Sequence, residues 1–279
     1  MKKIGFIDYF LNEWHADSYP AMIKRINPDY EVCCAYAHIE PPMSGKLSND
    51  EWCNQHGIER VKTIEEVIEK SDYIIVLSPD NPEMHEELSD LPLKSGKPVY
   101  VDKTFATDVA SAKRMFEKAK KYNTPMFTSS ALNYADELKE FPREGIEKIT
   151  VSYGGFYATH LIHQIEPAVV LAGCGGKCAT YFENPDPGIK LEFENGIVAE
   201  MTVLDAIDYE FGVTYKDGTE IKKVFNSPFF DNFIKKLLEF FETGRIPVSH
   251  EQTMKVISIV EASWKARDAE GKEVCVPKY

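Results

Sequence analysis

The sequence predicts two domains, a doubly wound α/β domain over residues 1–131 and an α+β domain over residues 132–279. In the first part, short apolar runs alternate with stretches of helical periodicity, the pattern of βαβ units around a parallel sheet. In the second part, strand-like runs are separated by Asn-Gly and Asp-Gly pairs, which are typical of hairpins in an antiparallel sheet. The length of 279 residues also fits two domains, since one domain takes roughly 150 residues.

Five apolar runs of the first part are predicted strands, at residues 4–7, 30–37, 73–77, 99–101 and 126–128. Helical periodicity predicts helices over residues 16–26, 63–70, 82–94 and 107–121. Thr63 followed by Glu66 has the capping-box pattern, which places a helix start there. Ligands of doubly wound sheets bind at the carboxyl ends of the strands. The residues to consider for binding therefore follow the strands: Asp8, His38, Ser78, Pro79, Asp80, Asp102, Lys103, Ser129 and Ser130.

The second part predicts a strand at residues 146–155 and a helix at 157–172 with an apolar stripe. Asn195-Gly196 and Asp217-Gly218 each predict a hairpin turn between two strands. Two helices, at about 228–242 and 250–264, close the chain. Strands joined by hairpins with separate helices predict an open, mostly antiparallel sheet covered by helices.

The chain has 32 Lys and Arg residues against 45 Asp and Glu residues, and its formal net charge is −13 with His neutral. This balance argues against a nucleic-acid-binding protein and a polybasic membrane-surface protein, because both need clustered positive charge. No apolar run approaches the roughly 20 residues of a membrane span, and the run at 4–7 is too short for a secretory signal. We therefore expect a cytoplasmic protein whose partner is a small molecule.

Three segments, in the same order along the chain, resemble the Gfo/Idh/MocA oxidoreductases. The first is residues 72–85 (DYIIVLSPDNPEMH) with 95–104 (SGKPVYVDKT), which is similar to the family's Gly-Lys-x-Val run and Glu-Lys-Pro triplet. The second is residues 163–166 (HQIE) with 171–173 (LAG), which is similar to the family's His-x-Ile-Asp helix. The third is residues 244–248 (GRIPV), 259–262 (IVEA) and 271–274 (GKEV), which resemble the closing segment.

This resemblance implies a Rossmann domain followed by a substrate domain, with NAD or NADP as cofactor and a sugar-like or polyol substrate. It implies that Lys103 polarises the substrate oxygen and that His163 moves the proton, roles that suit an ammonium and an imidazole. The positions it implies for the cofactor are Asp8, Phe10, Leu11, Ser78, Pro79, Asp80, His85 and Asp102, and those for the substrate are Tyr157, Thr159 and His160. It also implies a homo-oligomer, a dimer or tetramer, paired through the sheet runs at 189–193 and 197–204.

The cofactor signals depart from the family's pattern. A Rossmann site has Gly-x-Gly-x-x-Gly after the first strand, whereas no glycine lies between positions 6 and 44 here. Asp8, Phe10 and Glu13 fall where those glycines belong, and their charge and bulk oppose a pyrophosphate. After the second strand, which ends in Ala37-His38-Ile39, the nearest carboxylate for a ribose is Glu40, and no Arg follows to bind a 2′-phosphate. Thr104 replaces the proline of the triplet, the residue that most easily takes a cis peptide.

Three functions therefore stay open. The chain is an NAD(P)-dependent oxidoreductase with an unusual cofactor site, or it has lost dinucleotide binding and acts as a binding or regulatory protein or a partner subunit. The third reading is a non-redox hydrolase or lyase that uses the same cleft. His160, His163 and Glu166 share a helical spacing that could hold a metal, but a helix lining a polar cleft explains it as well, and we predict no metal.

Overall fold

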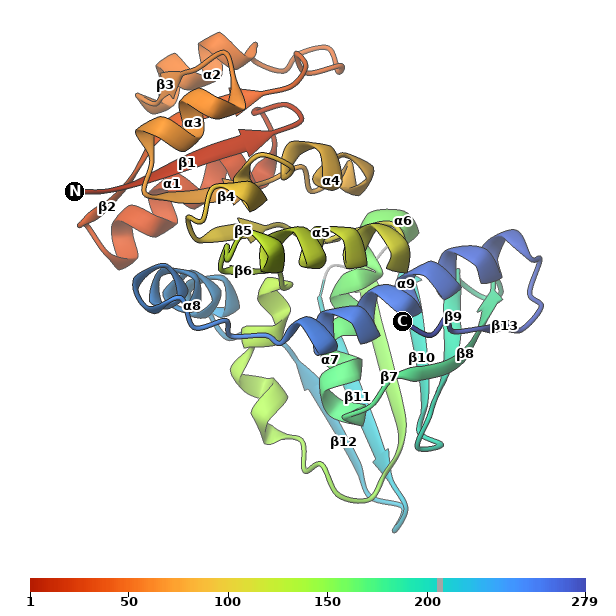
Figure 1. Ribbon diagram of the computed structural model, residues 1–279. Helices are drawn as coiled ribbons and strands as arrows, with labels where there is room; N and C mark the ends of the chain where they lie inside the picture. Colours follow the sequence, from red (N-terminus) through yellow and green to blue (C-terminus); the bar gives the residue numbers. More distant parts are fainter. Residues whose placement is uncertain (205–207) are drawn as a thin grey trace. The chain divides into compact units, whose positions relative to one another are not determined.

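The computed structural model describes residues 1–204 and 208–279, and the chain divides into two compact units (Figure 1). The first unit comprises Met1–Ala106, Ser111–Thr128 and Ile234–Ser249. The second comprises Thr107–Ala110, Ser129–Phe233 and His250–Tyr279. Each unit therefore takes residues from more than one stretch of the chain, and each has a sheet of its own.

The sheet of the first unit is parallel, with the order β3-β2-β1-β4-β5-β6. Its strands are β1 (Lys2–Asp8), β2 (Tyr30–Ala37), β3 (Glu59–Arg60), β4 (Tyr73–Val76), β5 (Val99–Val101) and β6 (Met126–Phe127). This is the strand order of the doubly wound dinucleotide-binding fold, in which the order reverses beside the first strand. The predicted fold of the first part is confirmed.

The helices of this part are α1 (Trp14–Ile26), α2 (Asn49–His56), α3 (Ile64–Lys70), α4 (His85–Leu88) and α5 (Val109–Lys121), with 3-10 turns η1 (Pro82–Met84) and η2 (Pro92–Lys94). One of them, α3, begins where its capping residues predict. Thr63 Oγ1 accepts from the Glu66 backbone N–H at 3.2 Å, and the Glu66 side chain accepts in return from the Thr63 N–H, so the predicted capping box is confirmed. The segment predicted as one helix at 82–94 is instead three short pieces, and a proline starts each 3-10 turn.

Residues 234–249, in and after α8 (Phe229–Thr243), complete the core of the first unit. The ring of Phe240 packs edge-on against Phe127 with centroids 4.8 Å apart, and Phe241 stacks on Tyr73 at 4.7 Å. The hydroxyl of Tyr30 donates to the Glu242 carboxylate at 2.6 Å. A segment distant in sequence therefore covers the amino-terminal ends of several strands of the parallel sheet.

The sheet of the second unit has the order β12-β11-β7-β10-β9-β8-β13. Its strands are β7 (Ile146–Gly154), β8 (Gly176–Phe182), β9 (Gly188–Phe193), β10 (Val198–Leu204), β11 (Glu210–Tyr215), β12 (Glu220–Val224) and β13 (Val274–Cys275). Among these described strands, all neighbours pair antiparallel except β7 and β10. The Asn-Gly and Asp-Gly pairs turn between β9 and β10 and between β11 and β12, as predicted.

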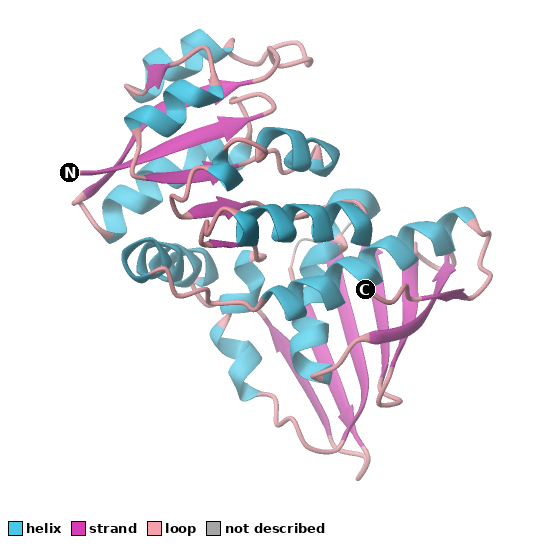
Figure 2. Ribbon diagram, in the orientation of Figure 1, coloured by secondary structure: helices cyan, strands magenta, loops and turns pink. Residues whose placement is uncertain are grey.

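Helices cover one face of this sheet, as Figure 2 shows for α7 (Ile162–Ala172) and α9 (His250–Asp268). The remaining helical pieces are α6 (Tyr157–His160), η3 (Ala131–Tyr134) and η4 (Asp136–Glu140). Along β10, buried residues alternate with half-exposed ones, so the second face carries polar groups such as the Lys148–Glu200 ion pair at 2.6 Å. None of the described helices is long and apolar enough to cross a membrane.

Candidate functional site

Buried carboxylates gather at the carboxyl edge of the parallel sheet. Asp8 ends β1 and Asp102 follows β5, and each is 1% exposed. Burial, followed by the negative charge of Glu13 and then that of Asp102, raises the pKa of Asp8 well above its ordinary value. One carboxylate oxygen of Asp8 accepts from the Tyr9 N–H at 2.7 Å, while the second has no partner among the described residues. The edge where doubly wound folds bind ligands is therefore acidic here.

Glu13 caps the N-terminus of α1 with its own side chain. Its carboxylate oxygens accept from the backbone N–H of Ala16 at 2.5 Å and of His15 at 2.7 Å. The His15 ring lies 3.2 Å from Glu13 through Nδ1 and 3.8 Å from Asp102 through Nε2. The first N–H groups of a helix form an anion site, so the anion at this helix comes from the chain itself.

A narrow cavity lies at the same edge, with about 150 Å³ of space that includes open solvent. It is lined by Asp8, Tyr9, Phe10, Glu13, Ser78, Pro79, Asp80 and Asn81. Five of the residues proposed for the cofactor thus share one cavity, but Leu11, His85 and Asp102 are not in its lining. The space between these residues does not admit a water-sized molecule, so the cavity holds no ligand as it lies.

His85 and Lys103 hold the segment after β5. The buried His85 ring lies between two carbonyl oxygens, with Nε2 at 2.7 Å from Leu77 and Nδ1 at 2.8 Å from Thr104, and burial lowers its pKa. Lys103 is also buried, and its ammonium donates to the Pro79 carbonyl at 3.4 Å. The Lys103–Thr104 peptide is cis although residue 104 is not proline. His85 therefore ties β4 to this segment rather than facing the cavity.

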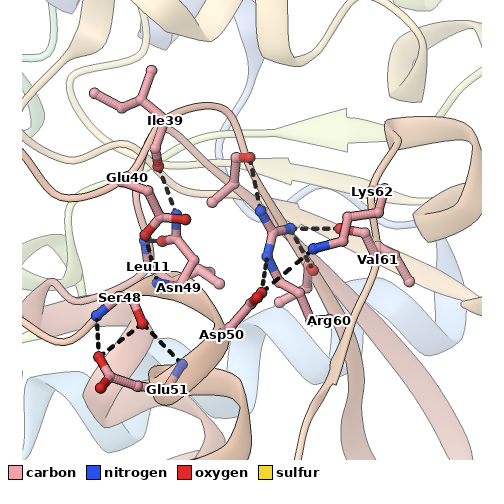
Figure 3. Close-up of polar contacts among 12 residues, drawn as sticks. Leu11, Ile39, Glu40, Ser48, Asn49, Asp50, Glu51, Arg60, Val61 and Lys62 are labelled. Atoms are coloured by element: carbon pink, nitrogen blue, oxygen red, sulfur yellow. Dashed lines mark hydrogen bonds and ion pairs between the residues drawn. The ribbon is translucent and has the colours of Figure 1, made fainter.

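The loops after β1 and β2 are joined by Asn49, as Figure 3 shows. Its side-chain amide donates to the Ile39 carbonyl at 2.7 Å, and its Oδ1 accepts from the Leu11 N–H at 3.0 Å. Its own backbone N–H donates to Glu40 at 2.8 Å, so the nearest carboxylate after β2 serves the start of α2. His38 stacks on the Tyr9 ring, with centroids 5.9 Å apart.

A second polar cluster lies in the second unit, around the start of η3 and the inner side of α7. His163 Nδ1 lies 2.6 Å from the Ser130 hydroxyl. The buried Glu166 accepts from the Ser130 N–H at 2.5 Å, from the Ser129 hydroxyl at 2.8 Å and from the Asn133 amide at 2.8 Å. Burial raises the pKa of Glu166 to about 7 against the lowering effect of the Ser130 and Ser129 hydrogen bonds. The loop with Ser129 and Ser130 and the helix with His163 are therefore one network.

The three residues proposed for the substrate lie at different places around α6. The hydroxyl of Tyr157 donates to the Ser263 carbonyl at 3.1 Å. Thr159 Oγ1 lies 2.9 Å from His160 Nδ1, and the His160 ring lies 6.0 Å from that of His163. His160 and His163 are thus neighbours, whereas the Tyr157 hydroxyl is held by α9. In the described ranges, no three His, Cys, Asp or Glu side chains are placed to hold a metal ion.

The comparisons with known proteins agree with this architecture. Residues 21–129 match the family model described as the oxidoreductase family with an NAD-binding Rossmann fold. This stretch is similar to the Gfo/Idh/MocA oxidoreductases. No curated protein matches the chain. The family match covers most of the parallel sheet and its helices, including Lys103.

Solved structures of the same fold match the whole chain. GenD2 from gentamicin A biosynthesis, solved in complex with NAD, is 12% identical, with a TM-score of 0.81 and coverage of 100% of this chain and 97% of that one. A probable dehydrogenase from Thermotoga maritima is 16% identical, with a TM-score of 0.74 and 98% coverage of each chain. A myo-inositol dehydrogenase from Corynebacterium glutamicum is 13% identical, with a TM-score of 0.74 and coverage of 100% and 99%. At these identities the likeness establishes the fold.

The residues at the edge of the first sheet do not fit the family's cofactor as they lie. A dinucleotide pyrophosphate needs the N–H groups that Glu13 already accepts from, and it would lie beside the buried Asp8. The ribose needs a carboxylate after β2, where His38 stands. Glu13, Asn133 and Ser130 shape the two clusters. Glu13 has a sequence signal because it stands at a glycine position, and Ser130 has one because it follows a predicted strand, whereas Asn133 has none.

Proposed function

We propose that the protein is a non-redox hydrolase or lyase of a sugar-like or polyol substrate, in which His163 takes a proton from water or from the substrate and returns it to the departing oxygen. The observation that carries this proposal is the 2.6 Å contact between His163 Nδ1 and the Ser130 hydroxyl on a half-buried histidine. Imidazole is the side chain whose ordinary pKa lies nearest neutrality, so it both takes and returns protons under working conditions. The fold of sugar and inositol dehydrogenases supports the substrate class.

The network around His163 suits proton transfer because a hydroxyl both donates and accepts. Ser130 accepts from Nδ1–H when the ring uses Nε2 as a base, and it donates to Nδ1 in the other tautomer. The backbone of Ser130 is fixed in turn by Glu166. The ring is therefore held in one orientation through both protonation states, which a proton carrier needs. These steps use only residues of the second unit and require no cofactor.

The test is ligand binding and turnover with the full chain. A panel of polyols, sugars and sugar acids is screened by thermal shift, and a ligand that stabilises the protein is then assayed for conversion by NMR. His163→Asn is expected to keep the fold and to reduce turnover by about 10²-fold or more, the usual share of a general acid–base group. His56→Asn, at a half-buried histidine at the end of α2 in the first unit, is the matched control. Unchanged turnover in His163→Asn would remove this residue from its role.

A second candidate is the NAD(P)-dependent oxidoreductase activity of the family, on the same class of substrate. It is favoured by the match over residues 21–129 and by Lys103, which keeps the place of the family's lysine after β5. Nicotinamide fluorescence during titration with NADH and NADPH separates the two: saturable binding favours the oxidoreductase. Binding of a polyol without turnover would instead favour a binding or regulatory protein or a partner subunit. The homo-oligomer and the cytoplasmic location stay predictions.

A further inference from the structure

We infer that this chain does not hold a dinucleotide where its family does, because Glu13 supplies the anion that the N-terminus of α1 would otherwise take from the cofactor. The inference goes beyond the proposed function, since it concerns the first unit and does not depend on His163. At the N-terminus of α1, the Glu13 side chain thus has the role that the bound cofactor has in the fold.

The geometry of the cap is the first argument. The helix α1 has 13 residues, and the N–H groups of His15 and Ala16 belong to its first turn. Both donate to the Glu13 carboxylate, at 2.7 and 2.5 Å. Glu13 is only 5% exposed, so its carboxylate is enclosed by protein and is not a mobile surface group. A phosphate oxygen would have to replace this carboxylate to reach the same donors.

Charge is the second argument. Asp8 and Asp102 are buried beside Glu13, and the nearby positive charge is that of Lys103, whose ammonium donates to the Pro79 carbonyl from outside the cavity lining. The negative charges of Glu13 and Asp102 both act on Asp8, so the three carboxyl groups share one poorly screened region. A pyrophosphate would bring two more negative charges into it. The family's site attracts phosphate with helix and backbone dipoles, and this edge repels it.

The residues after β2, where the family binds the adenosine ribose, also make their contacts within this chain. His38 takes the position of the ribose-binding carboxylate and stacks on Tyr9. Glu40, the next carboxylate, accepts from the Asn49 N–H at the start of α2. Glu13 therefore caps α1, and Glu40 accepts from the first N–H of α2, whose cap is Ser48; each lies in a loop that meets a dinucleotide in the family. The first unit is thus completed without a ligand, which explains why both loops are ordered by side chains of the chain itself.

Positions 8, 10 and 13 have the spacing of Gly-x-Gly-x-x-Gly, which makes a direct test possible. The full chain is compared with the triple variant Asp8→Gly, Phe10→Gly, Glu13→Gly by titration with NADH and NADPH, followed by nicotinamide fluorescence. We expect no saturable binding to the natural chain at millimolar cofactor and saturable binding to the triple variant, with a gain of at least about tenfold. Glu51→Gln, which alters the capping carboxylate of α2, is the matched control. We expect it to bring no gain in binding of NADH or NADPH.

Two results would overturn the inference. One is micromolar binding of NADH or NADPH to the natural chain, and the other is a triple variant that folds, by circular dichroism, but still does not bind. If the triple variant does not fold, Glu13→Ser replaces it, since Ser keeps a helix cap without charge. Inorganic pyrophosphate is then the probe in calorimetry: a gain over the natural chain supports the inference and no gain overturns it. Binding of NADH or NADPH to the natural chain would also favour the second candidate function, whereas the turnover of His163→Asn tests the proposed function separately.

Discussion

Glu166 makes the stability of the second unit depend on pH. It is buried, and its carboxylate receives the Ser130 N–H and the Asn133 amide at 2.5 and 2.8 Å. Burial nevertheless dominates and raises its pKa from 4.5 to about 7. The protonated form has a further partner available, because Asn133 Oδ1 is buried without a hydrogen bond to any described residue and could accept from a carboxyl O–H after the amide turns over. Glu166→Gln imitates this neutral form at the same size.

The sign and the size of this pH dependence follow from the linkage between proton binding and the free energy of unfolding. A carboxyl group whose pKa is higher in the folded state binds its proton more tightly there, so its contribution to stability is fully present below pH 4.5 and is lost as the pH rises through about 7. The full difference is about 3.4 kcal/mol, since one pKa unit corresponds to about 1.36 kcal/mol. Between pH 5 and pH 8 the free energy of unfolding should therefore fall by about 2.5 kcal/mol from this group alone.

The assay is urea unfolding of the full chain at pH 5, 6, 7 and 8. The natural chain should lose stability across this range, and Glu166→Gln should lose about 2.5 kcal/mol less because Gln does not ionise. Glu200→Gln, on the polar face of the same sheet, is the control and should keep the slope of the natural chain. If Glu166→Gln and the natural chain have the same pH dependence, Glu166 ionises near its ordinary pKa and the reasoning is wrong.

Three further changes test the packing of the first unit, each by thermal or urea unfolding. Gly5→Ala should cost about 1–3 kcal/mol, since a Cβ there would lie 2.4 Å from Val67 Cγ1; an unchanged midpoint would contradict the close approach of β1 and α3. Phe240→Ala should cost about 3–5 kcal/mol because its ring is fully buried against Phe127, and a cost near zero would argue that 234–249 is not part of this core. Thr63→Ala should cost about 1 kcal/mol through loss of the cap of α3, whereas Thr63→Ser should cost much less.

Much of the fold could be predicted because its signals are local. The strands β2 and β5 have the predicted bounds, since each is an apolar run closed by turn residues. The Thr63–Glu66 box and the two hairpin pairs were readable for the same reason: each needs only a few neighbouring residues. The helix α2 was missed although Ser48 and Glu51 form the same box, because its short polar sequence has little apolar periodicity.

The parts that could not be predicted depend on contacts between distant residues. Nothing local in 234–249 indicates that Phe240 packs beside Phe127. The partner of His163 is equally non-local, since Ser130 lies 33 positions earlier. The tertiary fold determines which residues hydrogen-bond to a reactive side chain. A motif identifies the reactive side chain but not the residues that hold it in place. The sequence therefore indicated His163 and Lys103 as candidates, but it could not indicate Asn133 or the role of Glu166.

The two carboxylates at helix starts explain how this fold keeps its form while its ligand site changes. The first N–H groups of a helix beside a parallel sheet have no partner within the helix and favour an anion as acceptor. In dinucleotide-binding members of the fold, a phosphate is that acceptor. A chain that loses the glycines must supply an acceptor in another way or leave the donors buried and unpaired, which costs free energy. Glu13 accepts from two N–H groups of α1, and Glu40 accepts from the first N–H of α2. We infer that Glu13 has at α1 the role of a cofactor phosphate, so a stable first unit is no evidence for a bound cofactor.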